Sequence, residues 1–236
     1  MIKAAVFDLD HTLFDRYGTM AKIMPVFYEK FDFSEGMTLE KVTELMIKAD
    51  KLYNHDGWDV ALDFLVKEGM FKEPPTFEYY RDSLLAAFRT DAVEYPFTKP
   101  MLDKLHAMGL KTGLITNGKS ITQRSKIDRL GLESYLDEIV ISGEIGIGKP
   151  NPEPFQIMAK RLNMKPEEII YVGDHPENDV DGSRGVGFIP VWVATLGRWT
   201  LPEIEKPNFS VNNVSEVPQI VEAINSGKDK LLLAKF

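Results

Sequence analysis

The chain has 236 residues, and its 36 acidic side chains outnumber its 28 Lys and Arg side chains to give a formal net charge of −8. This length is enough for a full hydrophobic core, or for one domain of ordinary size together with a smaller one. The chain has no cysteine, which excludes disulfides, thiolate chemistry and cysteine-ligated zinc. The acidic balance argues against general binding of nucleic acid or of anionic membranes.

Met1 leads directly into an apolar segment without a signal peptide. No apolar run approaches the ~18 residues that a membrane span requires. We therefore expect a soluble cytoplasmic protein, with a monomer as the default.

The first predicted element is a strand over residues 3–9, which ends in two aspartates within VFDLDHTLFD. Side chains of an extended chain repeat every second residue, so Asp8 and Asp10 are expected to point to the same side. Like charges held this close are usually relieved by a cation, by a proton on one member, or by solvent. Mg²⁺ suits such a pair because it prefers oxygen ligands. Solvated acids at an exposed strand end are the alternative.

Residues 16–95 are predicted to be entirely helical. Thr38 and Thr76 stand where N-caps belong. Apolar residues recur at spacings of three and four, separated by breaks such as SEGMT and KEPPT, over residues 20–31, 39–52, 58–69 and 77–88. We therefore predict a helical domain of residues 16–95, and a second domain that combines residues 1–15 and 96–236.

From residue 99 onward, short apolar strands alternate with helices. The expected strands are LKTGLIT, EIVIS, IIYVGD and FIPVWVA, and the expected helices cover residues 100–108, 120–130, 152–162 and 178–185. This alternation predicts an α/β fold with a doubly wound parallel sheet that has helices on both faces. An edge strand is expected at residues 208–211 and a helix at residues 217–223, whereas the tail KDKLLLAKF is packed or frayed.

Polar residues follow or end three of the expected strands, namely Asp8, Thr116 and Asp174. Ligands of open parallel sheets bind beyond the carboxyl ends of the strands, so we expect these side chains to converge. The hydroxyl of Thr116 is a helix cap or, together with the backbone N–H groups that follow it, a donor to an anion, which a helix N-terminus favours. Lys149 lies between Gly148 and Pro150 and is expected in a loop, where it is either a solvated side chain or a point charge that offsets negative charge on a ligand.

Four motifs in this order, VFDLD, LITNG, GKPNPEPF and GDHPENDVDG, resemble those of the haloacid dehalogenase superfamily of phosphatases. The resemblance spans residues 7–193. It implies a Rossmann-like core, and it implies that the helical insert of residues 16–95 is a cap that closes over the site, excludes water and supplies specificity contacts.

By this resemblance, Asp8 is the nucleophile that forms an aspartyl-phosphate. Asp10 corresponds to the general acid and base, which protonates the leaving oxygen and then deprotonates water. Dehalogenases of the family lack an aspartate at the position of Asp10, so its presence favours a phosphatase. His11 replaces the glycine that is most common at this point, which narrows the backbone freedom of the turn.

The resemblance also assigns the remaining motif residues. Thr116, Asn117 and Lys149 are expected to bind the phosphoryl group, and Thr116 and Lys149 count among the catalytic residues. The expected Mg²⁺ ligands are Asp8, Asp10 through its backbone carbonyl, and Asp174. Asp179 is expected to support the metal waters or the Lys149 ammonium.

The predicted function is therefore a Mg²⁺-dependent phosphatase that hydrolyses a small-molecule phosphomonoester through an aspartyl-phosphate. A phosphate-transferring sugar mutase and a narrow-specificity nucleotidase of the same family remain alternatives, as does a non-catalytic binding protein on the same scaffold. The substrate is left open. Arg16, Tyr17, His55 and Trp58 lie in segments that could face the site, although aromatic residues on helices more often belong to the core.

Overall fold

The computed structural model describes residues 1–53, 57–195, 197, 199 and 201–228. The chain forms two compact units. The larger unit combines Met1–Asp15 with the segment from Glu94 onward, and the smaller unit is Arg16–Val93.

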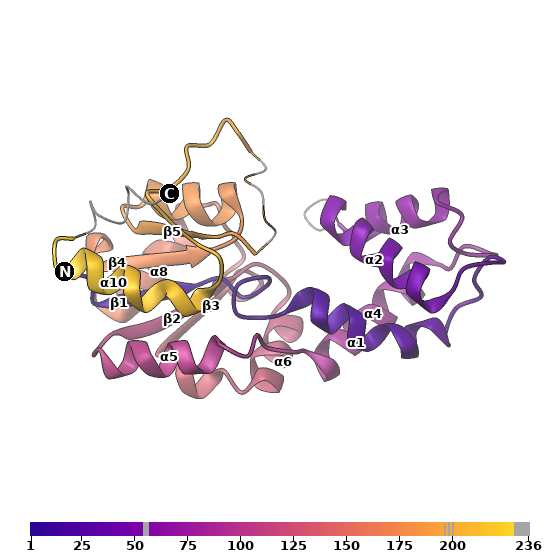
Figure 1. The fold of residues 1–236 in the computed structure, drawn as a ribbon, viewed down its shortest axis with the longest axis horizontal. Coiled ribbons are helices and arrows are strands. Elements are labelled where there is room, and N and C mark those ends of the chain that lie inside the picture. The colour runs from indigo at the N-terminus through magenta and orange to yellow at the C-terminus, as the bar shows by residue number, and fades with distance from the viewer. Residues whose placement is uncertain (54–56, 196, 198, 200, 229–236) are drawn as a thin grey trace. The chain divides into compact units, whose positions relative to one another are not determined.

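A parallel sheet of six strands forms the centre of the larger unit, in the order β3-β2-β1-β4-β5-β6 (Figure 1). The strands are β1 (Ala4–Phe7), β2 (Lys111–Thr116), β3 (Glu138–Ile141), β4 (Ile169–Gly173), β5 (Ile189–Val193) and β6 (Phe209–Val211). Phe7 at the end of β1 lies in register with Leu114 of β2 and Val172 of β4. The carboxyl ends of these three strands therefore lie next to one another.

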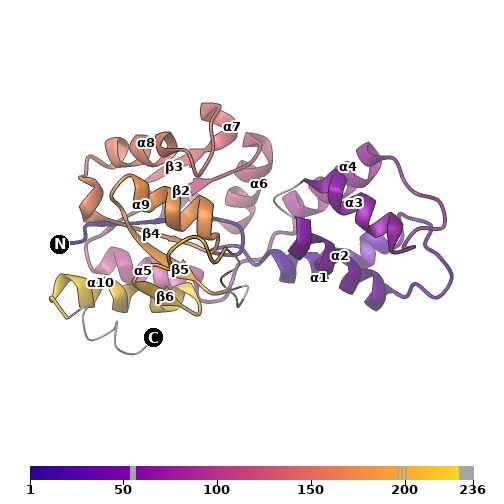
Figure 2. The ribbon, with the colours of Figure 1, turned by 90° about the horizontal axis from the view of Figure 1, so that it is seen from above.

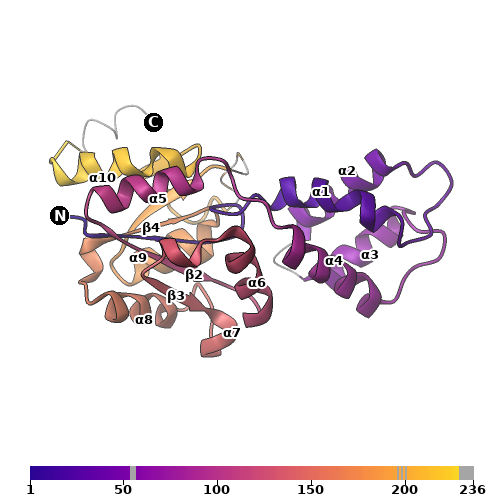
Figure 3. The ribbon, with the colours of Figure 1, turned by 90° about the horizontal axis from the view of Figure 1, so that it is seen from below.

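Helices cover both faces of the sheet. They are α5 (Thr98–Ala107), α6 (Ser120–Leu130), α7 (Ser142–Ile145), α8 (Pro152–Leu162), α9 (Gly182–Gly185) and α10 (Val217–Asn225), with short turns η1 (Glu133–Tyr135), η2 (Pro166–Glu168), η3 (Pro176–Asp181) and η4 (Val214–Glu216). Figure 3 shows α5 and α10 on one face, and α8 and α9 on the other. The predicted doubly wound parallel sheet is therefore confirmed.

The core beneath α8 explains why the central strands are apolar almost throughout. Phe155 and Met158 of α8 pack against Val6 of β1, Ile115 of β2 and Tyr171 of β4, and all five are buried. Burial on both faces of a parallel sheet removes the alternation of polar and apolar residues that a half-exposed strand would show.

The smaller unit is helical (Figure 2). Its helices are α1 (Arg16–Tyr28), α2 (Leu39–Tyr53), α3 (Trp58–Lys67) and α4 (Phe77–Asp91). The predicted caps are confirmed, because the Thr38 hydroxyl accepts from the Lys41 N–H at 3.3 Å and the Thr76 hydroxyl accepts from the Tyr79 N–H at 3.4 Å.

The prediction for the first helix was wrong at both ends, because α1 begins at Arg16 and ends at Tyr28. Phe31 lies beyond the helix but packs against Phe27, with ring centroids 4.4 Å apart. Apolar spacing therefore continues past the point where the helix stops.

Two other local predictions need correction. Strand β1 ends at Phe7 rather than at residue 9. The helix expected over residues 178–185 is divided between the π-helical turn η3, which ends at Asp181, and the short helix α9. Within the described residues, no helix has both the length and the apolar character needed to cross a membrane. All of the tail KDKLLLAKF except its first residue lies outside the described residues.

Candidate active site

The site lies at the carboxyl edge of three adjacent strands. Asp8 directly follows β1, Thr116 ends β2, and Asp174 directly follows β4. The sheet order therefore brings together residues that are widely separated in the sequence, as the position of each at the end of its strand predicted.

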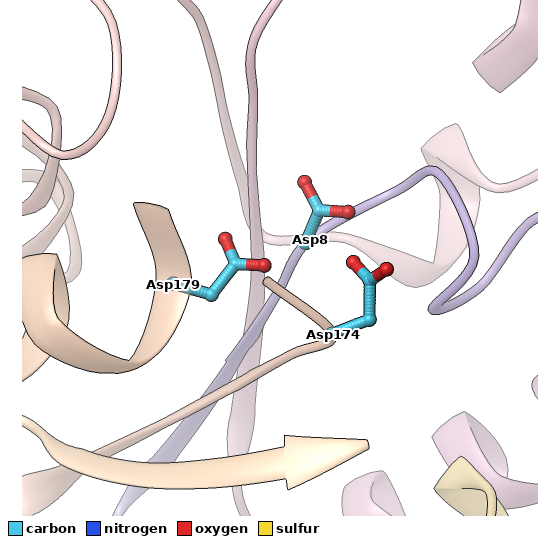
Figure 4. A group of neighbouring side chains, drawn as sticks. All are labelled: Asp8, Asp174 and Asp179. Atoms are coloured by element: carbon cyan, nitrogen blue, oxygen red, sulfur yellow. The ribbon is translucent and has the colours of Figure 1, made fainter. Parts of the chain in front are cut away.

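Three carboxylates form a cluster at this edge. Oxygen atoms of Asp8, Asp174 and Asp179 lie within 4.8 Å of one another, and Figure 4 shows the three carboxyl groups facing a common point. Asp179 lies in η3, and its Oδ2 accepts a hydrogen bond from the His175 N–H at 2.9 Å. A Cβ at Gly173 would collide with the Asp179 side chain, so glycine is required there to bring Asp179 next to the strand end.

Lys149 supplies positive charge to this cluster. Its Nζ donates to Asp8 Oδ1 at 2.6 Å, to Asp179 Oδ1 at 2.7 Å and to the Tyr171 hydroxyl at 2.9 Å. Tyr171 in turn donates to the backbone carbonyl of Ile115 at 3.2 Å. The ammonium is thus held between the proposed nucleophile, a second acid and a tyrosine of the central sheet.

Burial and repulsion shift the titration of this cluster. Burial raises the pKa of Asp8 to about 7, with Lys149 opposing the rise and Asp179 adding to it. Burial, followed by the charges of Asp179 and Asp8, raises the pKa of Asp174 well above its usual range. Burial alone would lower the pKa of Lys149, but Asp179 and Asp8 hold it well above its ordinary value.

Oxygen ligands, excess negative charge and close spacing are the properties of a site for a hard divalent cation. The cluster contains three carboxylates and one ammonium, so a cation such as Mg²⁺ would offset the repulsion that otherwise favours protonation. The carboxylates of Asp8 and Asp174, with Asp179 beside them, therefore fit a divalent metal.

Asp10 does not share this cluster. Its Oδ1 and Oδ2 accept from Lys126 Nζ at 2.8 and 2.9 Å, and its Oδ2 also accepts from Gln123 Nε2 at 3.2 Å. The charge of Asp10 nevertheless adds to the rise in the pKa of Asp8, so the expectation that the two aspartates serve one site stays a prediction. Because β1 ends at Phe7, the two-residue repeat of extended chain does not continue as far as Asp10.

The turn after β1 takes the backbone shape that a glycine would allow. His11 is buried and has φ of 61°, in the left-handed region that costs a residue with a Cβ about 1–2 kcal/mol. His11, which stands where the family most often has glycine, therefore occupies the position of this turn at which glycine would relieve backbone strain.

Thr116 and Asn117 make different contacts. The Thr116 hydroxyl accepts from Gln123 Nε2 at 2.6 Å and so keeps its own hydrogen for a ligand. The Asn117 side chain instead makes two bonds with the backbone of Lys149, because Nδ2 donates to its carbonyl and Oδ1 accepts from its N–H, both at 2.9 Å. A Cβ at Gly148 would lie 2.7 Å from Asn117 Oδ1. Asn117 therefore positions the Lys149 loop.

Sequence reasoning missed four residues at this edge: Gln123, Lys126, Tyr171 and Trp192. Trp192 of β5 donates from Nε1 to the Asp174 carbonyl at 2.8 Å. Gln123 and Lys126 are three positions apart on α6, so one face of the helix after LITNG carries both. That spacing was the available signal, but its direction relative to the sheet could not be read.

Three of the four residues considered for substrate contacts have side-chain contacts inside the helical unit. Arg16 is buried, donates to the Asp50 carboxylate at 2.6–3.1 Å and lies over the Phe88 ring. Trp58 packs against the same ring, with centroids 6.1 Å apart. Lys51 lies over the ring of Tyr17. His55 is outside the described residues.

Comparison with known proteins gives consistent matches over nearly the whole chain. The family described as haloacid dehalogenase-like hydrolase matches residues 5–193. The chain is 32% identical to glyceraldehyde 3-phosphate phosphatase of Methanocaldococcus jannaschii, over 94% of this chain and 98% of the relative. It is 29% identical to N-acylneuraminate-9-phosphatase of Mus musculus, over 95% of each chain. A crystal structure of a HAD phosphatase from Thermococcus onnurineus is similar with a TM-score of 0.65 and 25% identity, over 93% of this chain and 98% of that chain.

Proposed function

Because this chain belongs to the haloacid dehalogenase-like hydrolases, we propose that it is a Mg²⁺-dependent phosphatase that acts on a small phosphomonoester through an aspartyl-phosphate. The observation that carries the proposal is the position of Asp8, which follows the central strand β1 and is bonded to Lys149 inside the carboxylate cluster. The phosphatase names of the relatives support the reaction class.

In the first step, a carboxylate oxygen of Asp8 attacks phosphorus and the bond from phosphorus to the ester oxygen breaks. Asp10, in its protonated form, gives its proton to the departing oxygen. Lys149 and the Thr116 hydroxyl stabilise the negative charge on the transferring phosphoryl oxygens. The products of this step are the free alcohol and Asp8 carrying the phosphoryl group.

In the second step, Asp10 takes a proton from water, and the water oxygen attacks phosphorus. The bond between phosphorus and Asp8 breaks, inorganic phosphate leaves, and the Asp8 carboxylate is restored. Asp8, Asp174 and the Asp10 backbone carbonyl are the proposed Mg²⁺ ligands, with Asp179 beside them. When bound, the cation supplies positive charge that offsets the carboxylates and the phosphoryl oxygens.

The proposed cap is the helical unit Arg16–Val93, inserted between Asp8 and Thr116 in the sequence. A cap of this kind would exclude water and contact the part of the substrate that differs between esters. The relatives named glyceraldehyde 3-phosphate phosphatase make that triose phosphate the first ester to test, and the relative named N-acylneuraminate-9-phosphatase makes a sugar phosphate the second.

The test is release of inorganic phosphate from a panel of phosphorylated metabolites and from p-nitrophenyl phosphate, with Mg²⁺ and with EDTA. Wild type should require Mg²⁺, and Asp8→Asn should be inactive because the amide keeps the shape but removes the nucleophile. Asp181→Asn is the matched control, since Asp181 is an exposed acid of η3 that pairs with Arg184. Substantial turnover by pure Asp8→Asn would refute the nucleophile assignment.

The panel also separates the alternatives. A sugar mutase would return the phosphoryl group to a sugar and depend on a sugar bisphosphate, whereas the proposed phosphatase releases phosphate without one. A non-catalytic binding protein would release none from any ester.

A further inference from the structure

Lys126 is a buried lysine with a defined set of contacts. Only 5% of its side chain is exposed, and its Nζ bonds to both oxygens of Asp10, at 2.8 and 2.9 Å. The same ammonium lies 4.9 Å from the centre of the Phe14 ring. Asp10 and Phe14 are also joined by an isolated β-bridge, so Lys126 contacts both ends of the turn that carries Asp10.

Gln123 links this contact to the site for the phosphoryl group. It lies one helical turn before Lys126 on α6 and is 2% exposed. Its Nε2 reaches Asp10 Oδ2 at 3.2 Å and the Thr116 hydroxyl at 2.6 Å. One face of α6 therefore fixes the distance between the proposed proton donor and the proposed phosphate contact.

Hydrogen bonds from α6 are needed to fix the orientation of the Asp10 side chain, because it is 25% exposed and follows the end of β1. Lys149 is bonded to Asp8, Asp179 and Tyr171, so its contacts serve the nucleophile rather than Asp10. The two lysines come from different elements and serve different aspartates. A proton donor is effective only when it lies within hydrogen-bond reach of the atom it protonates.

We propose that Lys126 is a positioning residue that aims the Asp10 carboxyl group at the leaving oxygen, with Gln123 setting its distance from Thr116. This inference rests on the proposed phosphatase function. It assigns Lys126 no contact with substrate: the residue acts through Asp10. Its loss should therefore impair proton transfer more than attack by Asp8.

The choice of ester separates these two effects. An alkyl phosphate needs a proton on its leaving oxygen, whereas p-nitrophenolate departs without one. The ratio kcat/KM covers the steps through departure of the leaving group, so misplacing Asp10 should lower it for the alkyl ester and much less for p-nitrophenyl phosphate. A loss of folded protein would lower both values equally.

The experiment measures kcat/KM for wild type, Lys126→Met and Lys126→Gln. For each of these proteins, both esters are assayed with the same preparation. The alkyl ester is the metabolite that wild type hydrolyses fastest, with glyceraldehyde 3-phosphate tested first. Arg124→Met is the matched control, because Arg124 is also a cation of α6 but pairs with Glu144, outside the Asp10 turn. Because each ratio of alkyl to aryl activity comes from one preparation, the fraction of active protein cancels.

The expected result is a fall of at least tenfold in that ratio for Lys126→Met, a smaller fall for Lys126→Gln, and no change for Arg124→Met. Combining Lys126→Met with Asp10→Asn should be no worse on the alkyl ester than Asp10→Asn alone, because both changes act on one group. An unchanged ratio in both Lys126 variants, or additive losses in the double variant, would overturn the proposal. Absence of Mg²⁺-dependent hydrolysis by wild type would instead count against the proposed function.

Discussion

Asp174→Asn should abolish the stabilisation of this protein by Mg²⁺ while changing the stability of the metal-free protein little. In the absence of metal, burial and the charges of Asp179 and Asp8 raise the pKa of Asp174 well above its usual range, which favours its protonated form. Asparagine resembles that neutral form in shape and charge. The substitution therefore changes little until a cation would require the carboxylate.

The magnitude follows from linkage. A ligand present at 100 times its dissociation constant stabilises the folded state by about 2.7 kcal/mol. For a chain of this length, a change of 1 kcal/mol shifts Tm by about 2–4 °C, so saturating Mg²⁺ should raise the Tm of wild type by roughly 5–10 °C. Asp174→Asn should show a rise of less than about 2 °C at the same concentration, because one of the three clustered carboxylates is gone.

Thermal unfolding followed by circular dichroism measures this directly, in EDTA and across a Mg²⁺ titration at constant ionic strength. Asp181→Asn is the control, since it removes an exposed acid of η3 and should keep the full Mg²⁺ response. An equal rise in Tm for wild type and Asp174→Asn would refute the assignment of Asp174 to the metal site. A large fall in the Tm of metal-free Asp174→Asn would contradict the expectation that the metal-free fold tolerates a neutral side chain at this position.

Two further predictions concern charge in each unit. The pKa of Asp8 in the folded protein is about 7, above its ordinary 3.8, so the metal-free fold keeps a proton that the unfolded chain releases. Relative to Asp8→Asn, the free energy of unfolding of wild type should therefore fall by about 4 kcal/mol as pH rises from 4 to 7, and should not fall further above that. Urea unfolding in EDTA measures this difference. In the helical unit, Arg16→Leu leaves Asp50 buried without this partner and should destabilise by about 3–5 kcal/mol, whereas the double variant with Asp50→Leu should regain most of the loss. Equal destabilisation of the single and double variants would contradict the second prediction.

The strands and helices could be predicted from the sequence because the residue patterns that specify them are local. Strand-length apolar runs alternate with helical spacing, and the expected boundaries of α6 and α8 agree with the structure. The meeting of Asp8, Thr116 and Asp174 was readable for a topological reason, since parallel strands place their carboxyl ends on one edge.

The remaining parts of the site depend on tertiary packing. The sequence pattern predicts only that Tyr171 is a core residue of a buried strand, yet its hydroxyl lies 2.9 Å from Lys149 Nζ. Lys126 and Gln123 read as polar residues of a surface helix, and only the rotation of α6 against the core turns them toward Asp10. No periodicity within the chain specifies that rotation, because it is set by side chains of other elements.

Asp8 and Asp10 show how two identical side chains, two positions apart, come to differ. Asp8 lies among buried acids with Lys149, in an environment that suits a cation and a nucleophile. Asp10 lies in the turn after β1, where its carboxylate is bonded to Lys126 and Gln123 rather than to Lys149. Carboxylates acquire separate roles when their surroundings differ, and the end of β1 at Phe7 separates these two. The end of β1 at Phe7 therefore allows the two aspartates to have different neighbours, which the proposed chemistry requires.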